Sequence, residues 1–126
     1  MQQTEINVKK IVQESMLAVN IGSGTLRVLA TPVVAALFEN AALQLAATYL
    51  TNAETTVGSS ITVEHLAPTP LGGTVTVTAH LKAHEGRFFS FELLATDAKG
   101  IIAKGVHQRV TVMSDRFQQK AEERKV

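Results

Sequence analysis

The chain of 126 residues contains no cysteine, and this absence excludes disulfide bonds, thiolate nucleophiles and cysteine-ligated metals. It also has no excess of one charge, because 12 Lys and Arg face 11 Asp and Glu, for a formal net charge of +1. A nucleic-acid backbone therefore meets no broad positive surface. No apolar run is long enough to cross a bilayer, and residues 1–5 lack the pattern of a secretory signal. We expect one soluble, cytoplasmic domain spanning residues 1–126.

Several motifs that carry chemistry are absent as well. No two histidines have zinc-ligand spacing with a third ligand close by. The chain has neither the G-x-S-x-G turn of serine hydrolases nor a glycine-rich phosphate loop of the P-loop kind. We therefore expect no bound metal and no resident cofactor.

A long helix is predicted after Thr31 and Pro32. Threonine is a good N-cap, and proline is favoured at the first helical position because the N–H that it lacks has no intrahelical partner there. Residues 33–50 are rich in Ala and Leu and contain no Gly or Pro, which predicts a helix of about five turns. Its only charged residue is Glu39, so we expect the helix to be buried nearly all round.

From residue 55 onward, polar and apolar residues alternate with the period of two that is typical of strands with one buried face. Strands are predicted at 56–66, 73–84, 87–97 and 100–113, joined by two short hairpins and by a proline-stiffened crossover at 67–73. A first strand or strand pair is expected within 5–18, followed by a mobile loop at 21–30. The charged tail, about 114–126, is expected to be a frayed helix or disordered.

One architecture accommodates a single apolar helix together with these strands. An antiparallel sheet curled around a central helix covers the helix and buries one face of each strand. The predicted fold class is therefore α+β, of the hotdog type. The edge strands and the outer sheet face invite a second copy of the chain, and two-fold pairing is the commonest solution. We expect a homodimer, which can pair further into a tetramer.

Three side chains are candidates for chemistry. Glu39 stands alone in an apolar helix, where an unpaired carboxylate is costly unless it faces a wet pocket; alternatively, it surfaces at a seam. His65 ends a strand before the crossover, and imidazole exchanges protons near neutral pH; a capping or surface role is the alternative. Thr31 is equally well explained as a helix cap. The other histidines are interpreted as capping or surface residues: His80, His84 and His107.

Five stretches of the sequence are informative together: LATP (29–32), LFENA (37–41), VGS (57–59), VEHLAPTPLG (63–72) and GVHQRV (105–110). In order and approximate spacing they resemble the fluoroacetyl-CoA thioesterase-like family, over roughly residues 25–112. The resemblance implies a catalytic trio of Thr31, Glu39 and His65, with Gly58 and Arg109 near the substrate. It also implies that the site lies at a dimer interface, where Glu39 would face a wet cleft.

The chemistry that the resemblance implies is hydrolysis of an acyl-CoA thioester. Glu39 would attack the carbonyl or deprotonate water, and the sequence leaves both routes open. His65 would act as acid and base, Thr31 would orient a partner, and the backbone at Gly58 would receive the oxyanion. Arg109 would hold a substrate oxygen or a phosphate of coenzyme A; the alternative is a sheet-surface arginine.

The acyl group is expected to be small or medium in size. In the namesake enzyme, aromatic residues before the helix form a lid over the acyl pocket, whereas residues 21–30 here contain no aromatic residue. Two other functions stay open. A non-hydrolytic hotdog protein would bind an acyl-CoA or a related metabolite without cleaving it. An enoyl-CoA hydratase is the weaker alternative, because the Asp and His a few residues apart that such enzymes typically carry after a strand do not occur.

Overall fold

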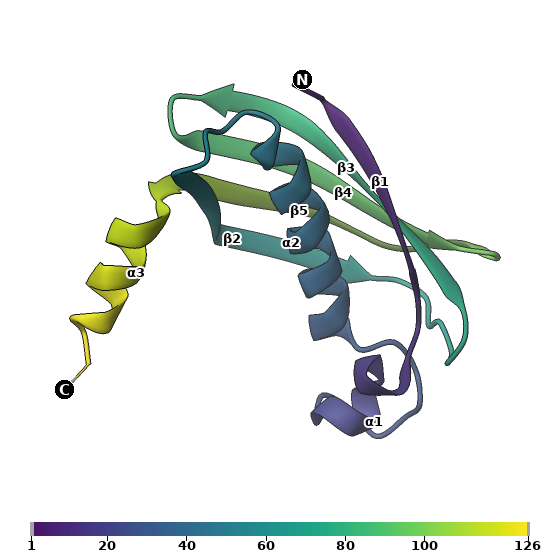
Figure 1. Ribbon diagram of the computed structural model, residues 1–126. Coiled ribbons are helices and arrows are strands. Elements are labelled where there is room, and N and C mark those ends of the chain that lie inside the picture. The colour runs from purple at the N-terminus through teal and green to yellow at the C-terminus, as the bar shows by residue number, and fades with distance from the viewer. Residues whose placement is uncertain (1, 126) are drawn as a thin grey trace.

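A five-stranded antiparallel sheet forms the body of the protein in the computed structural model, which describes residues 2–125 (Figure 1). The strand order is β1-β3-β4-β5-β2, so β1 and β2 are the two edges of the sheet. The strand bounds are β1 (Glu5–Ile11), β2 (Glu54–His65), β3 (Thr74–Glu85), β4 (Phe88–Asp97) and β5 (Gly100–Met113). The predicted antiparallel sheet is confirmed.

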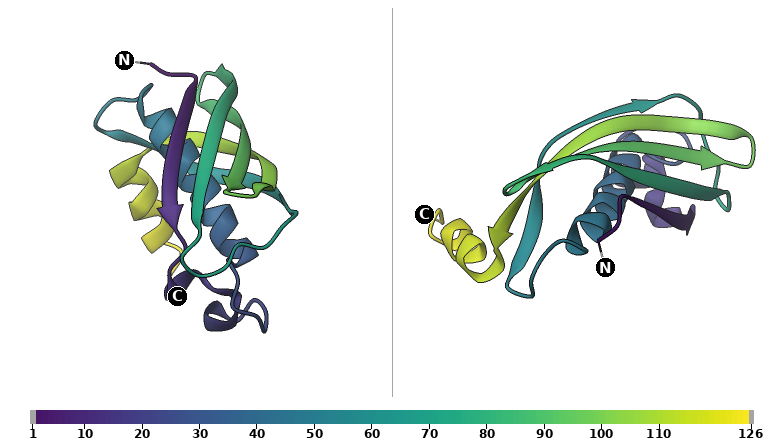
Figure 2. Two further views of the ribbon diagram at one scale, coloured as in Figure 1. Left: turned by 90° about the vertical axis from the view of Figure 1, so that its right-hand side faces the viewer. Right: turned by 90° about the horizontal axis from the view of Figure 1, so that it is seen from above.

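The helix α2 (Thr31–Ala47) lies against one face of the sheet, which curves around it (Figure 2). One side of α2 faces the sheet and is buried, through Val34, Phe38, Ala41, Ala42, Leu45 and Ala46. The opposite side, including Ala36, Asn40 and Gln44, is exposed. The prediction of a helix buried nearly all round is therefore wrong for the single chain, because the sheet covers only one side.

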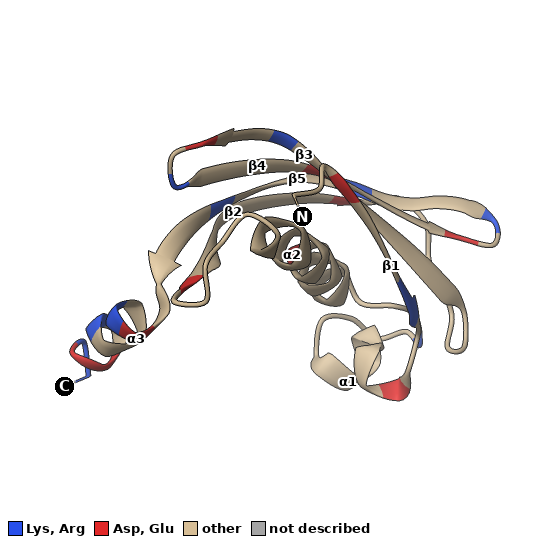
Figure 3. Cartoon of the chain, turned by 45° about the horizontal axis from the view of Figure 1, so that its top comes forward, with Lys and Arg blue, Asp and Glu red and all other residues tan. Residues whose placement is uncertain are grey.

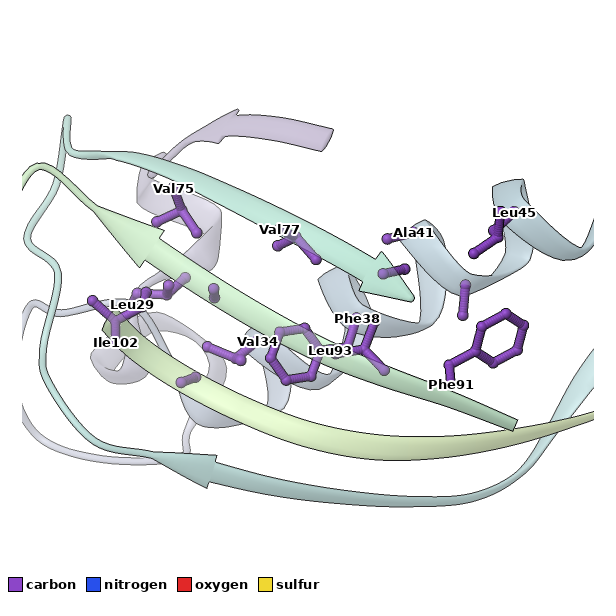
Figure 4. Close-up of a cluster of buried hydrophobic side chains, with 14 of the residues drawn as sticks. Leu29, Val34, Phe38, Ala41, Leu45, Val75, Val77, Phe91, Leu93 and Ile102 are labelled. Atoms are coloured by element: carbon purple, nitrogen blue, oxygen red, sulfur yellow. The ribbon is translucent and has the colours of Figure 1, made fainter. Parts of the chain in front are cut away.

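The core forms between α2 and the inward side chains of the central strands (Figure 4). Alternate residues of β3 and β4 point at the helix, among them Val75, Val77, Phe91 and Leu93. These side chains are at most 3% exposed. Full burial of one such side chain stabilises the fold by roughly 1.5–3 kcal/mol. The apolar residues of the alternating pattern in the sequence are therefore the ones that face the helix.

A β-bulge interrupts the pairing of β2 with β5. Gly58 pairs with Arg109 and Ser60 pairs with Gln108, so Ser59 is an extra residue with no partner of its own. An extra residue shifts the alternation of side chains between the two faces of a strand. Gly58 and His65, an odd number of residues apart, consequently both lie on the face towards α2.

The chain before α2 is less regular than the predicted strand or strand pair at 5–18. β1 ends at Ile11, and a short 3-10 helix η1 (Glu14–Met16) and the single-turn helix α1 (Ala18–Ile21) follow. The tail forms the helix α3 (Ser114–Glu122), which projects from the end of β5 and buries none of its residues (Figure 2). Within residues 2–125, no helix has both the length and the apolar character needed to span a membrane.

Candidate active site

Thr31 and His65 meet where the start of α2 approaches the end of β2. The crossover after β2 is tied to the segment before α2, because the N–H of Leu29 donates to the carbonyl of Thr69 at 2.8 Å and Val28 forms a bridge with Pro70. This connection places Oγ1 of Thr31 2.8 Å from Nδ1 of His65.

The interpretation of Thr31 as the N-cap is wrong. The N-cap is Ala30, and no side-chain hydrogen bond caps the helix, so Thr31 occupies the first helical position. Its hydroxyl is therefore available for the imidazole of His65. The other ring nitrogen, Nε2, is buried and has no hydrogen-bond partner among the described residues. A buried polar atom of this kind normally requires a partner, which a ligand or a water molecule can supply.

Glu39 belongs to a second cluster, around Gly58. A Cβ atom built on Gly58 would lie 2.9 Å from Oε2 of Glu39, 3.1 Å from Cε1 of His107 and 3.6 Å from Nη1 of Arg109. Any side chain at position 58 would therefore crowd the carboxylate and the imidazole. The cluster opens to solvent through a depression lined by residues of α2, β2 and β5: Ala36, Glu39, Asn40, Leu43, Thr56, Val57, Gly58 and Arg109.

Arg109 is fixed by hydrogen bonds rather than exposed on the sheet surface, so that alternative is wrong. Its side chain points at the helix and is 6% exposed. Nε donates to Oγ1 of Thr56 at 2.7 Å, Nη2 donates to the carbonyl of Thr56 at 2.8 Å, and Nη1 donates to Nε2 of His107 at 3.0 Å. Burial lowers the pKa of Arg109, and the nearby carboxylate of Glu39 opposes that shift. A positioned cation therefore lies near the carboxylate of Glu39, the acidic residue of α2 (Figure 3).

His107 is buried, and its interpretation as a capping or surface residue is also wrong. It is 1% exposed, and its Nδ1–H donates to the carbonyl of Ser60 at 2.7 Å, while Nε2 accepts from Arg109. Both nitrogens are thus occupied in the neutral form. Burial is the largest cause of its lowered pKa, the positive charge of Arg109 acts in the same direction, and the bond to Ser60 and the charge of Glu39 oppose them.

Two residues of this cluster, His107 and Thr56, were not among the candidates from the sequence. The signal for His107 lies in the spacing of Gly105, His107 and Arg109, which places all three on one face of a strand. Thr56 gave no comparable signal, because its hydroxyl and its carbonyl matter only once β2 lies beside β5.

The two clusters lie apart within one chain. Thr31 and Glu39 are eight residues apart in α2, which corresponds to about 12 Å along the helix axis. Gly58 lies near the middle of β2 and His65 is its last residue, roughly 20 Å further along the strand. The structure therefore brings Thr31 together with His65, and Glu39 together with Gly58 and Arg109, but it does not assemble the trio within one subunit.

Ordinary acid, base and electrostatic chemistry is what these side chains offer. The first cluster supplies an imidazole and a hydroxyl, and the second supplies a carboxylate and a fixed cation that both lie close to the Gly58 backbone. Within residues 2–125, no group of three or more His, Asp or Glu side chains is arranged to hold a metal ion.

An antiparallel sheet wrapped around one helix, with polar groups where the helix meets an edge strand, defines a protein of the hotdog fold. Comparisons with known proteins give the family. The sequence model of the FlK family, described as fluoroacetyl-CoA-specific thioesterase, matches residues 12–115, and the chain belongs to this family.

Individual relatives agree with that assignment. The fluoroacetyl-CoA thioesterase of Streptantibioticus cattleyicolor is 38% identical over 97 residues, which are 77% of this chain and 70% of the relative. A crystal structure of a variant of the fluoroacetyl-CoA-specific thioesterase FlK, in complex with fluoroacetate and CoA, has a TM-score of 0.91 and 30% identity, covering 96% of this chain and 99% of that chain. A hot-dog-like protein from Thermanaerovibrio acidaminovorans has a TM-score of 0.87 and 26% identity, covering 98% and 91%.

Proposed function

We propose that the protein hydrolyses the thioester bond of a small or medium acyl-CoA, giving the free acid and coenzyme A. The observation that carries the proposal is that the Glu39 carboxylate lies close to Gly58 and to the fixed guanidinium of Arg109. Membership of a thioesterase family, and the CoA-bound structure of a relative, support the same reaction. The absence of aromatic residues from 21–30 favours an acyl group other than fluoroacetyl.

In the proposed reaction, Glu39 deprotonates water, which then adds to the thioester carbonyl; direct attack by the carboxylate is the other route. The negative charge that develops on the carbonyl oxygen is stabilised at the backbone of Gly58 and by Arg109. Collapse of the intermediate breaks the C–S bond, and His65, held by Thr31, supplies the proton to the leaving thiolate. No cofactor takes part, since coenzyme A is itself a part of the substrate.

The working unit in this proposal is a cytoplasmic homodimer. β2 is a 12-residue edge strand whose outer side pairs with no strand of the described chain, and such edges favour pairing with another strand. If β2 pairs antiparallel with its copy around a two-fold axis, the end of one β2 lies beside the start of the other. Glu39 of one subunit would then face Thr31 and His65 of the other, and the exposed side of α2 would be covered.

Thiol release from a panel of acyl-CoAs, from acetyl to aryl and long-chain, tests the proposal. Release is expected on one class of ester, and Glu39→Gln is expected to reduce the rate by about 100-fold or more, because the amide cannot accept the proton from water. Glu64→Gln is the matched control, because Glu64 is exposed and lines a different depression, on the outer face of the sheet.

Two outcomes would contradict the proposal. Full activity of Glu39→Gln would exclude the carboxylate from the mechanism. Absence of release from every ester, together with saturable binding of acyl-CoA by calorimetry, would favour the non-hydrolytic binding protein instead.

A further inference from the structure

Three basic side chains converge at the end of the sheet, beyond the candidate active site. A depression of about 160 Å³ lies where α3 follows β5, lined by Arg87, Val112, Met113, Arg116, Phe117 and Lys120. Arg116 and Lys120 come from α3, and Arg87 comes from the turn between β3 and β4. Segments distant in the sequence thus contribute the three cations to one surface hollow.

No described residue neutralises these cations. Arg87, Arg116 and Lys120 make no salt bridge and no side-chain hydrogen bond within residues 2–125. Asp115, next to Arg116 in the sequence, lines an adjoining depression, and Glu122 pairs with Lys125. Like charges gathered in one hollow repel each other, and a multiply charged anion removes that repulsion while gaining charge-assisted hydrogen bonds.

The backbone fixes where these side chains begin. The carbonyl of Arg87 accepts the N–H of Thr111 at 2.8 Å, so this turn is attached to β5 just before α3. Arg116 and Lys120 are four residues apart in α3 and therefore lie on one side of the helix. Phe117, which is 44% exposed, adds an aromatic ring to the same hollow. Cations beside an accessible ring suit a ligand that carries phosphates and a planar base.

The hollow is within reach of a long substrate bound at Gly58. Arg109 and the start of α3 are five residues apart on the same strand, about 17 Å. The adjoining depression shares Met113 and Arg116 with the hollow and extends to Asn52 and Ala53, immediately before β2. A ligand with its thioester at Gly58 and its phosphates beside α3 would follow this route around the end of the sheet.

We propose that Arg87, Arg116 and Lys120 bind the phosphates of the coenzyme A nucleotide, with the adenine ring against Phe117. This inference rests on the proposed thioesterase function, because it assigns the end of the substrate that is remote from the reacting bond. The nucleotide would also order α3, a nine-residue helix that buries no side chain of its own.

Kinetics with two substrates test the assignment. The full-length double variant Arg116→Glu/Lys120→Glu is compared with wild type on an acyl-CoA and on the pantetheine thioester of the same acid, which lacks the nucleotide. The KM for acyl-CoA is expected to rise about tenfold or more with little change in kcat, because remote binding is lost equally from the ground state and the transition state. The kinetics on the pantetheine thioester are expected to stay unchanged.

The control variant is Lys9→Glu/Lys10→Glu, which changes the net charge by the same amount on the exposed strand β1. It is expected to leave both substrates unaffected. An equal rise in KM in this control, or a rise for the pantetheine thioester as large as that for acyl-CoA, would overturn the assignment. Retained activity on the pantetheine thioester shows that the variant is folded.

Binding of adenosine 3′,5′-bisphosphate, measured by calorimetry, gives a readout that does not require hydrolysis. Wild type is expected to bind it, and the α3 double variant is expected to bind at least about tenfold more weakly. Charge-dependent binding without hydrolysis of any thioester would uphold the nucleotide site while contradicting the proposed function. Equal binding by wild type and the α3 variant, or no binding by wild type, would overturn the site and leave the proposed function standing.

Discussion

At the scale of single residues, the position of Arg109 depends on the protonation of His107. The imidazole accepts a hydrogen bond from Arg109 through Nε2 and donates one to Ser60 through Nδ1. A proton on Nε2 would replace the acceptor by a donor and place a second positive charge beside the guanidinium. The network around Glu39 is thus complete only with neutral His107.

The stability of the protein is expected to fall in mildly acidic solution for this reason. The pKa of His107 is lower in the folded chain than its unfolded value of about 6.5, chiefly through burial. Its contribution to stability is therefore fully present above pH 6.5 and is lost as the pH falls through the folded pKa. Urea unfolding between pH 8 and pH 5 measures this loss.

His107→Gln is expected to flatten that pH dependence, because an amide accepts from Arg109 and donates to Ser60 without titrating. His80→Gln is the control, since His80 is exposed and its contact with Glu5 lies at the surface. An unchanged pH profile in His107→Gln would show that the imidazole is not the group responsible.

The sequence identified Glu39 and His65 but not the contacts around them. Glu39 stands out as the one charged residue of an apolar helix, and His65 because it ends a strand before the crossover, and both are local properties of the sequence. The hydrogen bonds from Arg109 to Thr56 and His107 depend on the register of β2 with β5, which the sequence does not specify. The inward orientation of the Arg109 side chain follows from this pairing.

At the scale of secondary structure, alternation predicted the four long strands to within two residues at each end. The predicted helix end at residue 50 is wrong by three residues, because apolar composition continues past Ala47, where α2 stops. The bulge at Ser59 could not be predicted, since residues 58–60 contain no apolar side chain whose alternation would reveal the shift.

Deletion of Ser59 is expected to remove most of the activity. Without the extra residue, the side chains on one side of the deletion must point to the opposite face of the sheet. Either Gly58 or His65 therefore leaves the face towards α2. A misplacement of catalytic groups by even 1 Å can cost about 100-fold in rate, and a loss of at least that size is expected in the thiol-release assay.

The control for this deletion is Ser59→Ala, which keeps the chain length and removes only the hydrogen bond from the hydroxyl to the carbonyl of Gln108. It is expected to change the free energy of unfolding by no more than about 0.5 kcal/mol and to retain activity. Similar activity in the deletion variant and in Ser59→Ala would show that the site does not depend on which face of the sheet the side chains of β2 point to.

At the scale of the whole molecule, the separation of the two clusters predicts complementation between inactive chains. If the protein works as the proposed homodimer, the Glu39→Gln variant and the His65→Ala variant are each inactive in the thiol-release assay. A mixed dimer carries one site with Glu39 from one chain and His65 from the other. Random pairing makes half of the dimers mixed, each with one intact site of two, so about a quarter of the wild-type activity is expected.

Co-refolding equal amounts of the two variants, followed by the thiol-release assay, measures that recovery. The control is co-refolding of Glu39→Gln with the double variant Glu39→Gln/His65→Ala, which cannot form an intact site in any pairing. If the mixture of single variants stays as inactive as this control, the trio acts within one subunit, and the shared-site arrangement is wrong.

The free edge of β2 has a consequence for how the cell would control this activity. In the proposed homodimer, two copies complete each site, so a site exists only when two chains have met. While most chains are single, the number of sites grows with the square of the chain concentration, so doubling expression would quadruple turnover. The reaction rate then depends more steeply on expression level than it does for an enzyme that is complete in one chain. Dilution lowers the activity per chain without any inhibitor.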